Sequence, residues 1–507
     1  MKTLLKLILL ILPSTLSAED IVVGGPWGGL NNYGFSNTYE GGITASDSDA
    51  LVSRNIEYSD DAMAFRKRPG YAYINGNINV STHTNFGGAS FIDGSGNERV
   101  VFTNDTKIIR VWPSAATIVS TDTSGSYYDF EVKNGELWRA NSSKDDILKY
   151  DGTNVTYYSS IPKGNQIEFL PDRGVISGVA SSENCFSFSK AADFTDYTTG
   201  LLETDGFQEC VGTNADEVIS IKTACGGVLV GTSNSLFLWT GTSQFDGVIE
   251  KLSEKIGIKS PYTVKEYNGE IYFQGSDNDV YRFNCNQIEK ISSKISKITL
   301  GLYHASDYRS AFFDSRGRYW LTIGSTGSEN SWTLIYAPSN NTWTYYSFPA
   351  VGGLSFKPSS SQTFSTWFGG ASTGSVNTMT ESFGLGLDAD DGANFTARFQ
   401  SKYFLGTSPY IEKRLNTYSI LMRQPPSGGS ATLTAKYYSN DLGVSAVTDT
   451  ITIAPVDRLY QRINRRFPSG TKADLVSISL ESTGEHEAFE IYGFSINYTP
   501  ESWRVYP

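Results

Sequence analysis

Residue types that perform acid–base or metal chemistry are few in this sequence and scattered along it. The histidines are His83, His304 and His486, and a histidine site needs partners around it. His304, with Tyr303 beside it and Asp307 close by, is the histidine that we single out as a candidate. The sequence holds no HExxH motif and no phosphate-binding glycine-rich loop before a helix. It therefore predicts no catalytic residue, no cofactor and no enzymatic activity.

The segment Asp388–Gly392 comes closest to a metal-ligand pattern. Its aspartates resemble part of a calcium loop, because Ca²⁺ takes oxygen ligands from carboxylates. The full pattern needs a glutamate about six residues after the glycine, and Arg398 stands there instead. Asp388 and Asp390 are thus metal candidates with an incomplete ligand set. We interpret the segment as a polar hinge between two domains, without a bound metal.

The densest cluster of positive charge is formed by Arg66, Lys67 and Arg68, directly before a Pro-Gly pair that favours a turn. The simpler interpretation is a solvated loop that ends at this turn. The functional interpretation is an interaction patch for an acidic neighbour, such as another copy of this acidic chain.

Charge and composition narrow the class of protein. The formal net charge of −12 argues against tight binding to a nucleic-acid backbone, which needs clustered lysine and arginine. Aromatic residues make up 13% of the chain, and 49 glycines stand against only 4 methionines. Because aromatic side chains favour half-buried strands and glycine supplies turns, this balance predicts an all-β protein.

Residues Met1–Ala18 have the pattern of a secretory signal, with two early lysines, an apolar run and a small residue before Glu19. The apolar run is shorter than the roughly 20 residues that a membrane-spanning helix needs, and no other stretch of the chain is apolar enough. The pattern predicts export with cleavage between Ala18 and Glu19. The alternative is an N-terminal segment that is buried or touches a membrane.

The cysteines are Cys185, Cys210, Cys225 and Cys285, and none belongs to a CxxC pair, which argues against zinc. In an exported chain they can form one or two disulfides, with three full connectivities. The strand-like contexts of Cys225 and Cys285 favour instead four small buried thiols.

From Val100 to about Glu381, short alternating strands and Gly/Asn/Asp turns recur at roughly the spacing of propeller repeats. The clearest copy is Pro261–Ile295, which reads as four consecutive strands. Asn134-Gly135 and Asn268-Gly269 are strong hairpin signals. We predict a β-propeller of roughly seven blades over residues 76–381. Large aromatics on its inner strands are expected in the core, and they are Trp112, Trp138, Trp239, Tyr281 and Trp320.

The flanks of this repeat differ from it. Residues 19–75 are predicted to be an irregular arm, because glycines crowd its start, with one short helix over Ser48–Asn55. From about Asn394 the period changes to strands of roughly five to ten residues. Residues 382–507 are therefore predicted to form a C-terminal β-sandwich of immunoglobulin-like or jelly-roll type.

Three segments carry a family resemblance. The arm, with "GGLN" and then "DALVSRNIEY…AFRKRPGY", resembles the start of propeller-type structural proteins of tailed bacteriophages. The stretch from Glu254–Gly257 to "VYRFN…ISSKI" is similar to tail nozzle and packaged-DNA stabilisation proteins of short-tailed phages. The strand-rich segment "DDGANFTARFQSKYFLG…EKRLNTYSILM" resembles the domain that follows their propeller.

The resemblance implies a structural virion protein of the tail nozzle, with the virion as its location. It implies a homo-oligomeric ring, usually a hexamer, that contacts other tail or head-tail adaptor proteins. DNA would pass through without specific binding, and a negative lumen suits this. The leader departs from the pattern, since phage tail proteins normally carry none. The alternative is therefore an exported bacterial β-propeller that binds glycans or a protein partner. A third hypothesis is a secreted glycan-cleaving enzyme, which would need only two carboxylates at a set separation.

Overall fold

The computed structural model describes most of the chain between Ala18 and Trp503. The described residues are 18–31, 39–40, 43–44, 49–60, 63–73, 87–104, 106–113, 116–122, 128–141, 145–212, 216–296, 308–324, 332–359, 364–370, 376–380, 390, 393–404, 411–423, 431–439, 445–453, 460–484 and 489–503. The leader up to Ser17, all three histidines and Asp388 lie outside these residues.

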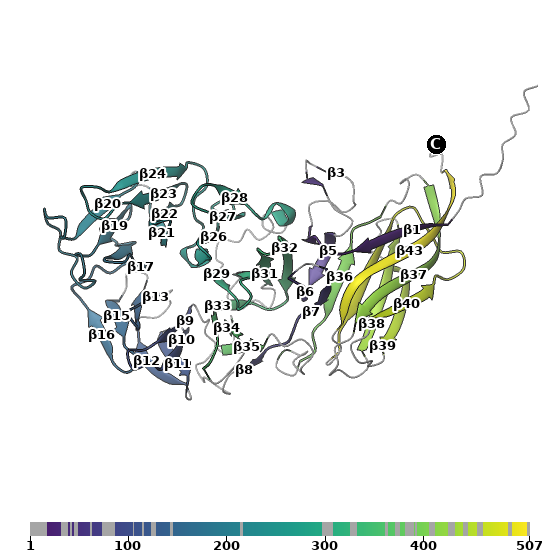
Figure 1. The fold of residues 1–507 in the computed structure, drawn as a ribbon, viewed down its shortest axis with the longest axis horizontal. Coiled ribbons are helices and arrows are strands. Elements are labelled where there is room, and N and C mark those ends of the chain that lie inside the picture. Colours follow the sequence, from purple (N-terminus) through teal and green to yellow (C-terminus); the bar gives the residue numbers. More distant parts are fainter. Residues whose placement is uncertain are drawn as a thin grey trace, which may run out of the picture.

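The architecture has two parts, a ring of small sheets and a pair of larger sheets beside it (Figure 1). Within the described residues its elements are β-strands and two short 3-10 helices, η1 (Pro261–Thr263) and η2 (Ser293–Ile295). The prediction of an all-β chain with a β-propeller is confirmed.

Five of the ring's sheets are four-stranded antiparallel meanders of consecutive strands. They are β9–β12 (Gly88–Ile92, Glu98–Asn104, Lys107–Trp112, Thr117–Thr121), β13–β16 (Asp129–Lys133, Glu136–Ala140, Ile147–Tyr150, Val155–Tyr158), β17–β20 (Gln166–Phe169, Gly174–Ser177, Cys185–Phe188, Phe207–Cys210), β21–β24 (Val218–Ala224, Gly227–Thr232, Leu236–Thr240, Val248–Ser253) and β25–β28 (Lys265–Tyr267, Glu270–Gln274, Val280–Phe283, Ile288–Lys290).

A sixth four-stranded sheet closes the ring with a strand from the N-terminal arm. Strands β33 (Ala350–Phe356), β34 (Ser365–Gly370) and β35 (Val376–Thr380) are completed by β8 (Ala72–Tyr73), whose Tyr73 pairs with Asn377. The inner strands β9 and β33 pack against each other, which joins the first sheet to the last.

A further four-stranded meander contains β29 (Tyr308–Phe313), β30 (Tyr319–Gly324), β31 (Trp332–Ala337) and β32 (Thr342–Tyr346). Strand β29 packs between β25 and β33 in the ring, but β32 also pairs with β5 (Asp49–Arg54). This pairing fuses the meander into a ten-stranded sheet. The independent four-stranded sheets therefore number six rather than the expected seven.

Local sequence explains these blades well. The φ values at both hairpin turns are positive, as a tight hairpin requires. They are 54° at Asn134 and 77° at Gly135, and 53° at Asn268 and 80° at Gly269. Of the five aromatics predicted for the core, Trp138, Trp239, Tyr281 and Trp320 are buried. Trp112 is partly buried and packs against a cluster of buried hydrophobic residues. Bulky side chains fill the wedges between blades, as expected for this architecture.

The second part consists of two sheets that share one core. The remaining strands of the ten-stranded sheet are β2 (Gly29–Leu30), β36 (Ala397–Ser401), β42 (Val476–Ser482), β38 (Ala431–Ser439) and β39 (Ser445–Ile453). The seven-stranded sheet contains β40 (Gln461–Arg466), β37 (Ile411–Arg423), β43 (Glu490–Trp503), β7 (Phe65–Lys67), β6 (Ile56–Tyr58), β1 (Glu19–Gly24) and β41 (Lys472–Ala473). Phe65 of one sheet stacks on Phe399 of the other, with ring centroids 4.1 Å apart.

The arm at residues 19–75 is not irregular where it is described, which corrects the prediction. It supplies β1, β6 and β7 to the seven-stranded sheet, β2 and β5 to the ten-stranded sheet, and β8 to the ring. It also contains the short hairpin β3 (Tyr39–Glu40) and β4 (Ile43–Thr44). The expected helix over Ser48–Asn55 is wrong, because Asp49–Arg54 is strand β5 and pairs on both sides. These pairings join distant segments, so no local pattern could indicate them.

The expectation of four buried thiols is also wrong. Cys185 is bonded to Cys210 across neighbouring strands of one blade, and Cys225 is bonded to Cys285 between two adjacent blades. The chain has no free cysteine.

Candidate functional site

Charged side chains from four consecutive inner strands gather beside the axis of the ring. Strand β13 supplies Asp129 and Glu131, β17 supplies Glu168, β21 supplies Lys222 and β25 supplies Lys265. We call these five residues the channel cluster. Successive inner strands pack against one another around the ring, so residues remote in sequence meet here.

Lys222 and Glu168 form the centre of the channel cluster. The Lys222 ammonium lies 2.5 Å from a Glu168 oxygen and 3.3 Å from a Glu131 oxygen. The other Glu168 oxygen accepts a hydrogen bond of 2.8 Å from the Thr223 hydroxyl. Asp129 accepts a bond of 3.0 Å from the backbone N–H of Ile167. These ion pairs and hydrogen bonds connect β13, β17 and β21, which are the inner strands of three blades.

Burial shifts the pKa values of side chains in the channel cluster. Desolvation raises the pKa of Asp129 to about 6, and the negative charge of Glu168 adds to this shift. Desolvation likewise raises the pKa of Glu131 to about 7, against the attraction of Lys222. Desolvation lowers the pKa of Lys265, with the carboxylate of Asp129 opposing it. Shifts of this kind, caused by burial plus specific charges, are frequent at functional sites.

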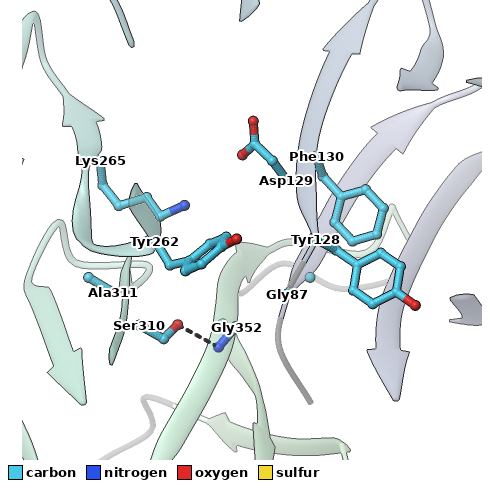
Figure 2. Close-up of a pocket in the computed structure, with 11 residues that line it drawn as sticks. Gly87, Tyr128, Asp129, Phe130, Tyr262, Lys265, Ser310, Ala311 and Gly352 are labelled. Carbon is cyan, nitrogen blue, oxygen red and sulfur yellow. Dashed lines mark hydrogen bonds between the residues drawn. The ribbon is translucent and has the colours of Figure 1, made fainter. Parts of the chain in front are cut away.

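A cavity of about 40 Å³ opens next to the channel cluster. Figure 2 shows the Lys265 amine and the Asp129 carboxylate directed toward one another across it, with the rings of Tyr262 and Phe130 nearby. The side-chain amine of Lys265 forms no hydrogen bond and no ion pair within 4 Å with any other residue that the structure describes. The space accommodates a few water-sized groups, so only a narrow polar part of a ligand can enter.

Glycines form the opposite wall of this cavity and keep it open. Gly352 has a φ of +59°, and a Cβ atom there would lie 2.6 Å from the backbone of Gly87. Its N–H donates a hydrogen bond of 3.1 Å to the Ser310 hydroxyl (Figure 2). The close approach of β9 and β33 thus excludes side chains from this wall.

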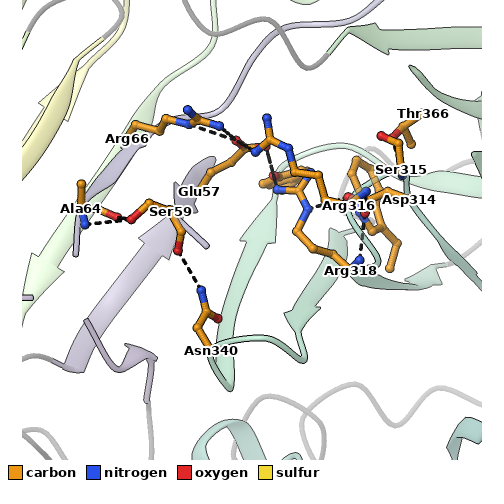
Figure 3. Close-up of polar contacts among 12 residues, drawn as sticks. Glu57, Ser59, Ala64, Arg66, Asp314, Ser315, Arg316, Arg318, Asn340 and Thr366 are labelled. Atoms are coloured by element: carbon orange, nitrogen blue, oxygen red, sulfur yellow. Dashed lines mark hydrogen bonds and ion pairs between the residues drawn. The ribbon is translucent and has the colours of Figure 1, made fainter. Parts of the chain in front are cut away.

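The candidate patch Arg66, Lys67 and Arg68 is not an exposed loop. Arg66 pairs with the buried carboxylate of Glu57 at 3.1 Å, as Figure 3 shows. Lys67 is 1% exposed and donates a bond of 2.7 Å to the carbonyl of Gly484. All three therefore bind acceptors within the chain, because they belong to strand β7 and the turn after it.

Arg68 also accounts for one of the two metal candidates. Its guanidinium is fully buried and pairs with both oxygens of Asp390, at 2.7 and 2.5 Å. It also lies 3.8 Å from the ring centre of Phe395. The carboxylate of Asp390 is thus engaged by a cation, and Asp388 is outside the described residues. Among the residues described, no group of three metal-ligand side chains is found.

The sequence analysis missed the channel cluster. One signal was available, since Asp129 and Glu131 occupy alternate positions along the segment that forms β13. Charged residues on one face of an inner strand are unexpected unless they meet partners. Their partners could not be identified, because Lys222 is two blades away along the chain and Lys265 is three blades away.

Comparisons with known proteins find solved structures of low sequence identity and low TM-score. No protein-family model and no curated protein matches the chain. Among solved structures, YCF48 bound to D1 peptide is 12% identical, with a TM-score of 0.40 over 62% of this chain and 98% of that one. The WD40 domain of Pan2 from Neurospora crassa is 8% identical, with a TM-score of 0.40 over 64% of this chain and 98% of that one.

A third similar structure is an extracellular domain from B. thetaiotaomicron. This domain of the one-component system BT4673 from B. thetaiotaomicron is 12% identical, with a TM-score of 0.42 over 76% of this chain. The chain spans about half of that domain, 47% of its length. Within the described residues, no helix has the length and apolar character needed to cross a membrane.

Proposed function

We propose that this protein is an exported, non-enzymatic β-propeller that binds a glycan, with one end of the glycan held in the central channel. One observation carries the proposal: Lys265 and Asp129 face a single cavity whose rim includes the aromatic rings of Tyr262 and Phe130 (Figure 2). Pockets that bind small ligands are mostly apolar and have a few convergent polar groups.

Each part of this cavity matches a feature of a sugar. An ammonium donates hydrogen bonds and a carboxylate accepts them, so adjacent hydroxyl groups can bridge Lys265 and Asp129. The faces of Tyr262 and Phe130 offer an apolar surface to the C–H groups of the ring. A volume of about 40 Å³ takes hydroxyl or hydroxymethyl groups and leaves the rest of the glycan outside.

Binding without cleavage fits the state of the carboxylates. A glycosidase needs one carboxyl group as acid and a second as nucleophile or base. Glu168 is held by Lys222 and Thr223, Glu131 pairs with Lys222, and Asp129 accepts a hydrogen bond from Ile167 and faces Lys265. These contacts support a binding role.

Export fits the cysteine chemistry. The chain carries two disulfides, and such bonds persist in oxidising compartments outside the cytosol. Together with the leader expected at Met1–Ala18, they support a location outside the cytoplasm.

The proposal also includes a seventh blade and a β-sandwich. The meander β29–β32 serves as a seventh blade, since β29 packs between β25 and β33. The two sheets that share a core act as a β-sandwich attached to this blade. A subunit of a phage tail nozzle, assembled as a hexameric ring, stays a prediction from the resemblance alone.

A glycan array followed by calorimetry tests the proposal. The mature protein is expected to bind a defined class of glycan ends, and Lys265→Met should reduce the affinity about tenfold or more, because it removes a charged hydrogen bond. Lys255→Gln is the matched control, since it removes the same charge from an exposed position outside the cavity. Equal binding by both variants, or no binding of any glycan, would overturn the proposal.

A further inference from the structure

One face of the ten-stranded sheet carries a row of polar and aromatic side chains, beside Leu334 and Trp343 of the same face, which are buried. Strands β31, β32, β5, β36, β42 and β38 lie side by side across the junction of the two parts (Figure 1). Tyr345 pairs with Arg54, Arg54 pairs with Arg398, and Arg398 pairs with Glu481. Directly paired residues project from the same face of a sheet. The opposite face, with Phe399 and its neighbours, is packed in the core.

One end of the row is an exposed aromatic pair. Trp332 of β31 is 40% exposed and stacks on Tyr345, with ring centroids 5.2 Å apart and planes at 29°. Other tryptophans with described surroundings, such as Trp239, Trp320 and Trp343, are fully buried. Trp332 therefore does not serve the same packing role as they do.

The rest of the row is positively charged. Arg54 is exposed, and its guanidinium forms no hydrogen bond or ion pair with another residue that the structure describes. Arg398 and Lys436 share a single carboxylate, Glu481, at 3.0 and 2.5 Å. Three cations thus stand against one anion on a chain whose net charge is −12.

We propose that this face, defined by Trp332, Tyr345, Arg54, Arg398 and Lys436, binds an acidic polysaccharide. Sugar rings lie on the aromatic pair through their C–H faces. Guanidinium groups pair with planar carboxylates in a two-point geometry that an ammonium cannot match, so Arg54 selects carboxylated sugars. Six strands at about 4.8 Å spacing give a track of roughly 24 Å, which is long enough for several linked sugars. The positive charge favours this ligand over neutral chains.

This face is separate from the channel, so its ligand does not depend on the glycan proposed for the cavity. Trp332 and Arg54 lie on β31 and β5, and neither lines the cavity next to Lys265. A chain that binds at both places would hold a polymer along its side and an end in its channel.

Affinity electrophoresis and calorimetry with three probes test the proposal. The probes are polygalacturonate, neutral dextran and single-stranded DNA. The protein should bind polygalacturonate, with an affinity that falls as salt increases, and should bind dextran and DNA at least tenfold more weakly. Trp332→Ala should reduce affinity about fivefold through the lost stacking, and Arg54→Gln about tenfold through the lost charged hydrogen bonds.

Matched controls keep this test specific. Tyr460→Ala removes an aromatic that is 60% exposed elsewhere, and Arg466→Gln removes an exposed arginine from β40. Both controls, and Lys265→Met, should bind polygalacturonate as the wild type does. Three results would overturn the proposal: no binding of polygalacturonate, unchanged binding by both Trp332→Ala and Arg54→Gln, or equal affinity for DNA, which would indicate a general polyanion surface.

Discussion

The carboxylate of Glu57 and the guanidinium of Arg318 form an ion pair of 2.8 Å although they are 261 residues apart in the sequence. Glu57 is 1% exposed and is also contacted by Arg66 and Arg316, each at 3.1 Å (Figure 3). Burial alone would raise the pKa of Glu57, but the three arginines, Arg318 foremost, hold it well below its usual value. This pair fastens the arm to the meander β29–β32.

The first prediction concerns Glu57. Replacing it with glutamine should reduce the free energy of unfolding by about 3 to 5 kcal/mol, because buried arginines lose their counter-charge. A chemical denaturation curve measures the loss. Glu254→Gln, at an exposed ion pair with Lys251, should change stability by less than about 1 kcal/mol. Equal effects of both changes would contradict a special role for the buried pair.

The same carboxylate should make the protein sensitive to acid. A group whose pKa is lower in the folded state stabilises that state above its unfolded pKa, and the stabilisation disappears as pH falls through the folded pKa. The wild type should therefore lose stability below about pH 4. Glu57→Gln should lose less over the same range, which melting temperatures measured from pH 6 to pH 2 will show.

Asp129, unlike Glu57, should lower the stability of the folded state as pH rises. Its folded pKa of about 6 exceeds its unfolded value, so the folded state binds the proton more tightly. This contribution to stability is complete below the unfolded pKa, near 4, and is lost as pH rises through 6. Asp129→Asn should therefore gain melting temperature relative to the wild type between pH 4.5 and pH 7. Parallel pH profiles for the two proteins would refute the assignment.

The disulfides should provide measurable stability. Cys225 and Cys285 close a loop with a sequence separation of 60 residues, and the chain-entropy model assigns such a loop about 4 kcal/mol. The double change Cys225→Ala and Cys285→Ala should therefore lower the midpoint of chemical unfolding substantially. Mass spectrometry after alkylation without reduction should detect no modified cysteine in the wild type. One or more alkylated cysteines would contradict the observed pairing.

Closure of the ring should depend on β8. Tyr73→Pro removes a backbone donor from the strand that completes the last sheet, where Tyr73 pairs with Asn377. Hydrogen exchange should then accelerate throughout β33–β35. Tyr157→Pro in the outer strand β16 is the control, because that strand belongs to a sheet made only of consecutive strands. The faster hydrogen exchange caused by Tyr157→Pro should remain within β13–β16.

Local features of the fold could be predicted from the sequence, and distant ones could not. The hairpins at Asn134-Gly135 and Asn268-Gly269 depend on two adjacent residues, and the buried Trp239 and Trp320 depend on one strand each. By contrast, the partner of β1 is β43, at the other end of the chain. No pattern within a short window records such a pairing, so the arm was expected to be irregular.

In the candidate site, too, local features could be predicted from the sequence and contacts between distant residues could not. The alternation of Asp129 and Glu131 is visible in the sequence, but their meaning depends on Lys222 and Lys265 from other blades. The cluster Arg66–Arg68 shows the reverse problem. Its charge density indicated an interaction patch, whereas its acceptors are Glu57, Gly484 and Asp390 within the same chain.

The position of β1 has a consequence for biosynthesis. Residues Glu19 to Gly24 pair with Tyr498 to Gly493, so β1 has no native partner until β43 has been synthesised. The seven-stranded sheet can therefore complete its pairing only after the part of the chain between these two strands has left the ribosome. Until then β1 is an unpaired strand that must be kept from pairing elsewhere.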